Sequence, residues 1–283
     1  MVGLIGTGYI GHGLADCLLN AGRGLHVHDV HPERADDLVA RGAAFDDSPR
    51  AVAEECEIVF MAVVSDEQVE EVLFGDWGAA STDCAGKVFI DTATIPPSRS
   101  REFAKRLANR GAAYLDAPLI GGRNEGRSET MPVGGPEETF RRCRPLLETV
   151  AKNVVHVGPL GSGEVVKLMN QTLVCARMAA RAEAVAYAEA EGVSLESADA
   201  ALGNHDRAVG WLAESAKRQE AHGDATHWTR LFLKDMNCAL QAGHGMAIAR
   251  AVRDLNALAM KTEPEKGWPY SFLAAARRRM QGL

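Results

Sequence analysis

Three polar side chains near the middle of the chain, Lys167, Asn170 and Gln171, follow a glycine-rich segment at residues 161–163. At helical spacing they stand at i, i+3 and i+4, and therefore share one face of a helix. A lysine there can exchange a proton with a substrate, and either amide can hold a substrate oxygen. Because a free lysine titrates near ~10.4, burial and a nearby cation would have to lower its pKa toward neutrality. In the alternative interpretation, Lys167 is a surface lysine whose stem covers apolar neighbours and Asn170 only packs the helix.

A second chemical signature lies at the start of the chain, where a glycine motif follows a short apolar run. Its members are Gly6, Thr7, Gly8, Tyr9, Ile10 and Gly11. Glycines at this spacing allow a tight turn, close approach of a pyrophosphate and packing of the next helix, whose N-terminus faces the phosphates. Asp29 follows the second apolar run, 18 residues after Gly11, and can bind ribose hydroxyls. We therefore expect a dinucleotide site.

The position of Asp29 also bears on the choice between the two nicotinamide cofactors. A carboxylate there repels a 2′-phosphate, which favours NAD over NADP without excluding NADP. Arg34 is the main argument for NADP, and a simple turn-capping role is the alternative for Asp29. His26, His28 and His31 lie nearby, but no accompanying carboxylate–histidine pattern predicts a metal site.

Composition excludes several other classes of function. The 283 residues carry 31 basic and 38 acidic side chains, a formal charge of −7, without the basic block that nucleic-acid binding needs. Six scattered cysteines lack the spacing of a zinc site or a disulfide framework. No apolar run approaches the ~20 residues that span a bilayer, and the first residues lack a signal-peptide pattern. We expect a cytoplasmic protein that acts on a small molecule.

The elements that must position these residues change in character along the chain. Short apolar runs alternate with helical stretches, which predicts a parallel sheet with crossover helices; the runs are residues 2–5, 25–28, 58–64, 88–90, 113–115 and 154–157. From residue 165 to 191 there is no proline or glycine, which predicts one long helix, and the remainder reads as further helices. The prediction is a doubly wound α/β (Rossmann) domain at residues 1–158, joined by the long helix to an all-α domain at 159–283.

Together with the glycine motif and the Lys167 segment, three further motifs carry a family resemblance: DTATIPP at residues 91–97, DAPLIGG at 116–122 and the pair Lys234–Asp235. The chain resembles the β-hydroxyacid dehydrogenases, among them 3-hydroxyisobutyrate dehydrogenase and tartronate semialdehyde reductase. The resemblance implies reversible, NAD(P)-dependent oxidation of a short 3-hydroxy acid, with Lys167 as the catalytic lysine. It also implies a homodimer or homotetramer formed through the helical domain. The cofactor wall would add Val63, Val64, Gln68, Thr94 and Lys234.

The resemblance implies a substrate-binding segment that departs from the family pattern. Relatives carry a serine at the position of Ile120, which we place on a loop, so only the amides of Gly121 and Gly122 would remain for a substrate carboxylate. Arg123 could replace the hydroxyl with a bidentate grip on a carboxylate, sulfonate or phosphonate, or could be an exposed loop arginine. Gln171 stands where the family usually has asparagine.

Arg207 and Trp211 fall in the region from which the family closes its substrate pocket, although surface and core roles are favoured for them. Two other functions compete with a hydroxyacid dehydrogenase. Imine reductases have a similar architecture but generally replace the lysine. A non-catalytic nucleotide sensor would explain Ile120 and Gln171, yet such a protein would be expected to lose Lys167 first.

Overall fold

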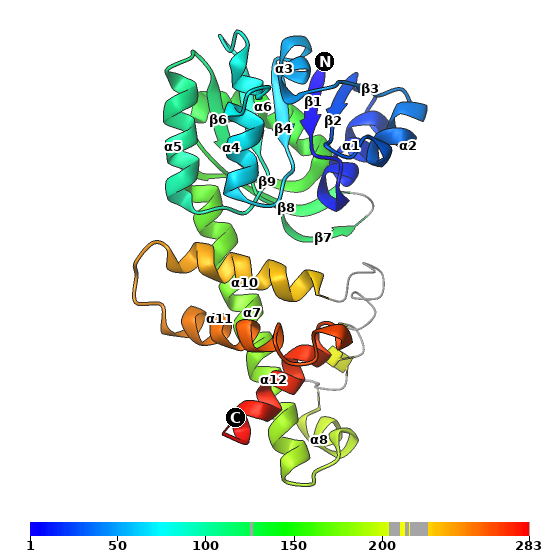
Figure 1. Cartoon of the computed structure of the whole chain (residues 1–283), viewed down its shortest axis with the longest axis vertical. Helices are drawn as coiled ribbons and strands as arrows, with labels where there is room; N and C mark the ends of the chain where they lie inside the picture. The colour runs from blue at the N-terminus through cyan, green and yellow to red at the C-terminus, as the bar shows by residue number, and fades with distance from the viewer. Residues whose placement is uncertain (125–126, 204–209, 213–214, 216–225, 283) are drawn as a thin grey trace. The chain divides into compact units, whose positions relative to one another are not determined.

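The computed structural model describes residues 1–124, 127–203, 210–212, 215 and 226–282, with the backbone alone for residues 122–124 and 127. Two compact units divide the chain, Met1–Lys167 and Leu168–Leu283. The boundary between them falls inside one long helix, α7 (Ser162–Ala190). The predicted α/β and all-α architectures, linked by this helix, are confirmed (Figure 1).

The first unit is built on one mixed sheet. Its strands are β1 (Val2–Ile5), β2 (Leu25–His28), β3 (Ala44–Phe45), β4 (Ile58–Met61), β5 (Val88–Asp91), β6 (Ala113–Asp116), β7 (Ile120–Asn124), β8 (Arg127–Gly134) and β9 (Ala151–Gly158). The order is β3-β2-β1-β4-β5-β6-β8-β7, with β9 paired to β8. Strands β1 to β6 pair in parallel, whereas β8 pairs antiparallel with both β6 and β7.

Helices cover both faces of this sheet, as the crossover connections of parallel strands require. They are α1 (Tyr9–Asn20), α2 (Asp36–Ala40), α3 (Pro49–Glu55), α4 (Asp66–Phe74), α5 (Pro97–Ala108) and α6 (Glu137–Val150), with short 3-10 turns at Pro32–Ala35 and Ala79–Ser81. Ser48 is the N-cap of α3, because its hydroxyl accepts a hydrogen bond from the Ala51 amide at 3.2 Å.

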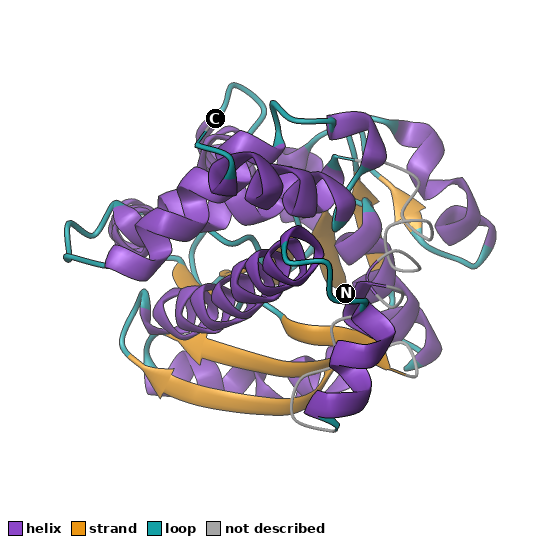
Figure 2. Ribbon diagram, turned by 90° about the horizontal axis from the view of Figure 1, so that it is seen from below, coloured by secondary structure: helices purple, strands orange, loops and turns teal. Residues whose placement is uncertain are grey.

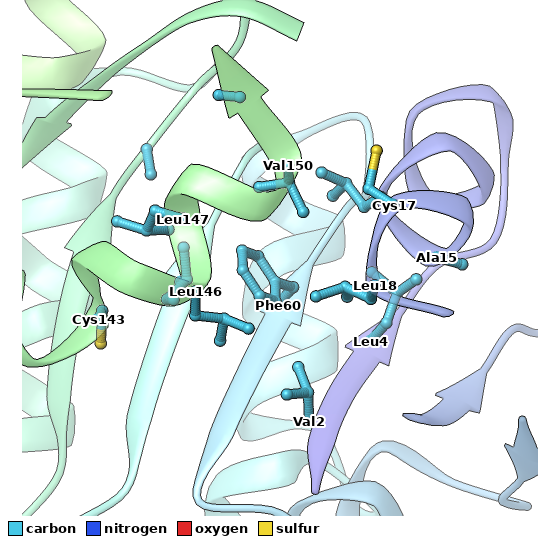
Figure 3. Packing of buried hydrophobic residues seen from close by; sticks show 14 of the residues in the cluster. Val2, Leu4, Ala15, Cys17, Leu18, Phe60, Cys143, Leu146, Leu147 and Val150 are labelled. Carbon is cyan, nitrogen blue, oxygen red and sulfur yellow. The ribbon is translucent and has the colours of Figure 1, made fainter. Parts of the chain in front are cut away.

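Alternation of side chains along the strands divides the core between the two faces. In β4, Phe60 belongs to the cluster that contains Leu18 of α1 and Leu146 of α6, and its neighbour Val59 belongs to the cluster on the other face. Figure 3 shows Phe60 between Leu146 and Leu18. The central strands of the sheet are therefore buried on both sides, and the buried acids Asp91 and Asp116 lie at the ends of β5 and β6.

One prediction about this unit is wrong. The segment around Ile120 is not a loop, since Ile120–Asn124 forms β7 and pairs with β8. Residues 121 and 122 lie opposite Glu129 alone, because the register shifts between Ile120 and Arg123. Such a bulge bends a strand and redirects its groups. The two glycines in the sequence concealed the strand, because glycine is a weak strand former.

In the part of the chain that the structure describes, every strand belongs to the first unit. Figure 2 shows the strands in orange among the helices in purple. The second unit consists of most of α7, with α8 (Leu195–Leu202), α10 (His227–Leu240), α11 (Ala247–Ala259), α12 (Tyr270–Met280) and a 3-10 turn at Pro264–Lys266. Its core joins α7, α10, α11 and α12 through residues such as Val185, Met236, Leu255 and Phe272. No helix among the described residues combines the length and the apolar character needed to cross a membrane.

Candidate functional site

The glycine motif lies where the prediction placed it, between β1 and α1. Gly6 adopts φ +92°, and a Cβ atom at Gly11 would lie 1.8 Å from the Gly6 carbonyl oxygen, so only glycine allows the turn to close. Around Gly8, by contrast, no atom lies within 4 Å of a Cβ position. Gly8 is also the N-cap of α1 and supplies no side-chain cap. The first turn of α1 therefore has open space and uncapped amides, which fit a pyrophosphate.

Asp29 lies at the end of β2 beside this motif and is only 6% exposed. Its Oδ2 accepts hydrogen bonds from the Thr7 amide at 2.7 Å and the Thr7 hydroxyl at 3.2 Å, and its Oδ1 accepts one from the His31 amide at 2.9 Å. The Arg34 guanidinium lies 3.8 Å from Oδ1. The carboxylate is thus fixed next to the glycine turn by backbone donors, which is also what a turn cap would require.

A cavity of about 450 Å³ opens at this edge of the sheet. Six of the residues predicted to bind the cofactor line it: Gly6, Gly8, Asp29, Val63, Val64 and Gln68. The Gln68 side-chain oxygen accepts a hydrogen bond from the Val64 amide at 2.8 Å, which fixes the loop between β4 and α4. Tyr9 and Ile10 occupy the first turn of α1 and are 57% and 38% exposed.

His26 and His28 lie on β2, and both contact Asp46, which follows the neighbouring strand β3. The Nδ1 of His26 lies 2.9 Å from Asp46 Oδ2, and the Nδ1 of His28 lies 2.8 Å from the Asp46 carbonyl oxygen. A search of the described residues finds no group of three or more histidine, cysteine or acidic side chains suited to a metal ion.

The loop after β5 carries Thr94, and hydrogen bonds to the buried Asp91 side chain fix its position. Asp91 accepts a hydrogen bond from the Ala93 amide at 2.9 Å and another from the Tyr114 hydroxyl at 2.5 Å. Burial raises the pKa of Tyr114 well above its ordinary value, and the Asp91 carboxylate adds to this effect, so the phenol remains a donor. Thr94 is half-buried on this loop at the carboxyl edge of the sheet and is not among the residues that line the cavity.

Two buried carboxylates connect the start of α7 to these loops. Asp116, at the end of β6, accepts hydrogen bonds from the Gly161 amide at 2.8 Å and the Glu164 amide at 3.0 Å, and therefore caps the helix N-terminus. The Glu164 side chain in turn accepts a hydrogen bond from the Ile95 amide at 3.2 Å. Three segments far apart in sequence, around residues 91–95, 116–119 and 161–167, are thereby brought together in the first unit.

Lys167 lies one turn further along α7 and is half-buried. Its Nζ donates a hydrogen bond to the Leu119 carbonyl oxygen at 2.6 Å. Leu119 immediately precedes β7, so the lysine ammonium lies beside the segment that begins with Ile120, Gly121 and Gly122. Gly121 adopts φ +83° within the bulge of β7. The structure therefore joins the predicted proton donor to the predicted substrate-binding segment.

The other predicted polar residues lie in the second unit and form a network of side chains. Gln171 Nε2 donates to Asp235 Oδ2 at 2.6 Å, and Lys234 Nζ lies 3.0 Å from Asp235 Oδ1. Asn170 Nδ2 donates to Gln171 Oε1 at 3.4 Å. Asp235 is 1% exposed and holds both Gln171 and Lys234. The amide nitrogen of Gln171 is consequently committed to a carboxylate.

Sequence reasoning missed three residues of these sites. In the sequence Asp116 is only the first residue of a motif, although an acid directly after a buried strand is a signal for a capping or binding role. Asp235 stands there only as the neighbour of Lys234, and no pattern in the sequence distinguishes Trp77, which lines the cavity. Trp211 is buried in the core of the second unit, Arg123 is described by its backbone alone, and Arg207 lies outside the described residues.

Comparisons with known proteins indicate the family to which the chain belongs. Residues 1–158 match the NAD binding domain of 6-phosphogluconate dehydrogenase, and residues 161–276 match the NAD-binding domain of NADP-dependent 3-hydroxyisobutyrate dehydrogenase. The chain is 35% identical to 2-hydroxy-3-oxopropionate reductase of Escherichia coli, over 87% of this chain and 85% of that one. It is 34% identical to L-threonate dehydrogenase of Cupriavidus necator, over 84% and 82%. A crystal structure of 3-hydroxyisobutyrate dehydrogenase from Salmonella typhimurium superposes with a TM-score of 0.80 and 28% identity, covering 96% and 98% of the two chains.

Proposed function

Because the chain belongs to the β-hydroxyacid dehydrogenase family of NAD(P)-dependent oxidoreductases, we propose that it interconverts a short 3-hydroxy acid and its semialdehyde with Lys167 as the proton-transfer group. The observation that carries this proposal is the bond between Lys167 Nζ and the Leu119 carbonyl oxygen, which holds the ammonium beside the segment at residues 120–122. Asp116 and Glu164 support it, because they fix the first turn of the same helix.

Lys167 would act on the oxygen of the reacting carbon. In the reductive direction its ammonium gives a proton to the oxygen as the carbonyl becomes a hydroxyl, and in the oxidative direction its amine takes the proton back. When bound, a nicotinamide would supply or accept the hydride. The hydrogen bond to the Leu119 carbonyl oxygen orients the Lys167 nitrogen. It does not neutralise the charge of the ammonium, since a backbone carbonyl is an uncharged acceptor.

The β7 segment would hold the acid group of the substrate. Ile120 has no hydroxyl to offer, so the amides of Gly121 and Gly122 in the bulge and the Arg123 guanidinium are the proposed donors. The named substrates of the two curated relatives, 2-hydroxy-3-oxopropionate and L-threonate, support a small hydroxylated acid as the substrate class. Asn170 would hold the reacting oxygen in preference to Gln171, because the Asn170 nitrogen makes the longer bond, 3.4 Å to Gln171 Oε1, whereas the Gln171 nitrogen bonds to Asp235 at 2.6 Å.

For the cofactor, the proposal is NAD in preference to NADP. Asp29 lies where the ribose is expected, and Glu71 and Asp76 add negative charge to a cavity whose lining includes one guanidinium, that of Arg34, so the cavity disfavours a 2′-phosphate. Thr94 and Lys234 remain proposed contributors to the cofactor and substrate region. Association through the helical unit into a dimer or tetramer is likewise proposed from the family, and the cytoplasmic location remains a prediction.

The decisive experiment couples turnover to binding. We expect the purified protein to oxidise NADH with 2-hydroxy-3-oxopropionate, or to reduce NAD⁺ with 3-hydroxyisobutyrate, glycerate or L-threonate. Lys167→Met should lower kcat by about 10² to 10⁴ while leaving the dissociation constant of ADP-ribose unchanged. Lys105→Met, which removes an exposed lysine of α5, serves as the matched control.

The outcomes separate the alternatives. Turnover by Lys167→Met at the rate of the parent would refute the lysine assignment. Cofactor binding without turnover of any hydroxy acid, semialdehyde or imine would favour a nucleotide sensor. Activity confined to sulfonate or phosphonate analogues, and lost in Arg123→Gln, would assign acid recognition to Arg123.

A further inference from the structure

Three large apolar side chains of the first unit are exposed around one cavity. Val30 is 82% exposed, Val64 60% and Trp77 66%, and all three line the cavity at the carboxyl edge of the sheet. Scattered exposed apolar residues are ordinary, but several that converge on one concave site mark the place of an apolar ligand group. Pro49 and Val72 extend the same apolar wall.

Trp77 is exposed although its backbone is firmly held. The Trp77 carbonyl oxygen accepts a hydrogen bond from the Arg50 amide at 2.9 Å, which ties it to the start of α3. On either side of it, the Gly78 amide donates to the Gly75 carbonyl oxygen at 2.9 Å and closes the turn that follows α4. A side chain presented on an anchored turn loses little conformational freedom when a ligand covers it.

The charges around the cavity indicate which part of a dinucleotide meets this ring. The glycine turn is the site for the pyrophosphate, and Asp29 next to it suits the ribose. The acidic side chains of Glu71 and Asp76, near Trp77 in the chain, also line the cavity and make their part of it unsuitable for phosphate. An uncharged planar group with polar edges fits there, because its faces can meet apolar walls while its edge nitrogens meet polar side chains.

We propose that Trp77 covers the adenine ring of the cofactor and is a determinant of cofactor affinity. This inference rests on the cofactor part of the proposed function and is independent of the substrate and of Lys167. Stacking of an aromatic side chain on a base accounts for the affinity, and it acts equally on NAD(H) and NADP(H), since both carry adenine.

The test measures binding of ADP-ribose, which lacks the nicotinamide, by isothermal titration calorimetry. Trp77→Ala should raise its dissociation constant about tenfold, and Trp77→Phe should restore most of the loss, because phenylalanine retains a stacking face. Val39→Ala, an exposed apolar residue of α2 that does not line the cavity, should leave it unchanged. An unchanged dissociation constant in Trp77→Ala would overturn the proposal.

Fluorescence gives a second readout. Of the four tryptophans only Trp77 belongs to the first unit, the others being Trp211, Trp228 and Trp268. Saturating ADP-ribose should change the emission of the parent and not that of Trp77→Phe. Asp29→Asn should change the ratio of NADPH to NADH affinity, whereas Trp77→Ala should weaken both alike; a change in that ratio in Trp77→Ala would count against adenine stacking.

This design separates the two proposals. A protein that turns over no hydroxy acid but binds ADP-ribose in a Trp77-dependent manner supports the adenine contact while refuting the proposed reaction. If the parent turns over hydroxy acids and Trp77→Ala binds ADP-ribose as tightly as the parent, the proposed reaction is supported and the adenine contact is refuted. Failure of the parent to bind ADP-ribose would refute the adenine contact outright.

Discussion

Three buried carboxylates, Asp29 and Asp116 in the first unit and Asp235 in the second, are held in different ways. In the first unit, the backbone amides of Thr7 and His31 bond to Asp29, and those of Gly161 and Glu164 bond to Asp116. In the second unit, Asp235 is held by the side chains of Gln171 and Lys234. Backbone donors are present whatever the side chains are, as long as the chain keeps its path. Side-chain donors exist only in the company of particular neighbours.

This difference has a consequence for mutation. A backbone-built site should respond mainly to changes that alter the path of the chain, such as a side chain added at a crowded glycine. A network of side chains should respond to the removal of any member, and its members should be energetically coupled.

The largest effect is expected at Gly11. In Gly11→Ala the new methyl group would lie 1.8 Å from the Gly6 carbonyl oxygen, a backbone atom that cannot move without opening the turn. We expect the free energy of unfolding to fall by about 3 kcal/mol, at the upper end of overpacking effects. Urea denaturation followed by circular dichroism measures the change.

Gly8→Ala is the matched control, since no atom lies within 4 Å of its Cβ position. Its stability should change by less than about 0.5 kcal/mol. Its dissociation constant for NADH should nonetheless rise at least tenfold, because the methyl group fills the space left for the pyrophosphate. Equal losses of stability in the two variants would contradict a turn that requires glycine at position 11 and tolerates alanine at position 8.

The side-chain network of the second unit gives the next largest effect. Asp235→Ala would leave the ammonium of Lys234 and the amide of Gln171 without their shared acceptor. The free energy of unfolding should fall by about 2 kcal/mol, because a partner of a buried polar group is removed. Tryptophan emission reports on this unit, which contains Trp211, Trp228 and Trp268.

A double-mutant cycle sharpens the same prediction. Asp235→Ala combined with Gln171→Leu should cost less than the sum of the single changes, with a coupling energy of about 1 kcal/mol. Arg141→Gln, which breaks an exposed ion pair with Glu137, should change stability by less than about 0.5 kcal/mol. Strict additivity at Asp235 and Gln171 would show that the network is not a coupled unit.

The same contrast explains which parts of the molecule the sequence could predict. The glycine motif, the strand before it and Asp29 lie within one βαβ unit, so their positions follow from local rules of turn and helix formation. The long helix α7 could be predicted equally well, because residues that favour helices continue without interruption from its start. The strand β7 was not, since its glycines oppose strand propensity and its pairing with β8 is a tertiary effect.

The polar contacts of the candidate site could be predicted from the sequence only in part. Lys167 could be singled out by its type and neighbours, but its bond to Leu119 joins residues 48 positions apart. The bond between Gln171 and Asp235 spans 64 positions. Spacing within a helix or strand cannot predict such contacts, because they depend on how whole elements pack. Trp77 escaped notice for a related reason, since only the cavity distinguishes it from an ordinary surface tryptophan.

The smallest effect concerns the charge of Asp116. Burial raises the pKa of Asp116, and the backbone hydrogen bonds from Gly161 and Glu164 oppose this shift without cancelling it. A carboxyl group whose pKa is higher in the folded than in the unfolded state binds more protons when folded. Its contribution to stability therefore declines as the pH rises from its ordinary value of 3.8 through the raised pKa.

Asp116→Asn should remove this decline. As the pH rises from 3.8 through the raised pKa, the parent should therefore lose unfolding free energy relative to the variant. Glu70→Gln provides a control of opposite sign: hydrogen bonds from Arg106 and Arg99 lower the pKa of Glu70, so its contribution is lost as the pH falls. Urea midpoints measured across the acidic range test both slopes. If the unfolding free energies of the parent and Asp116→Asn change with pH in the same way, the backbone amides fully offset the effect of burial on the pKa of Asp116. In that case a buried carboxylate that is bonded to the main chain has no net cost of ionisation.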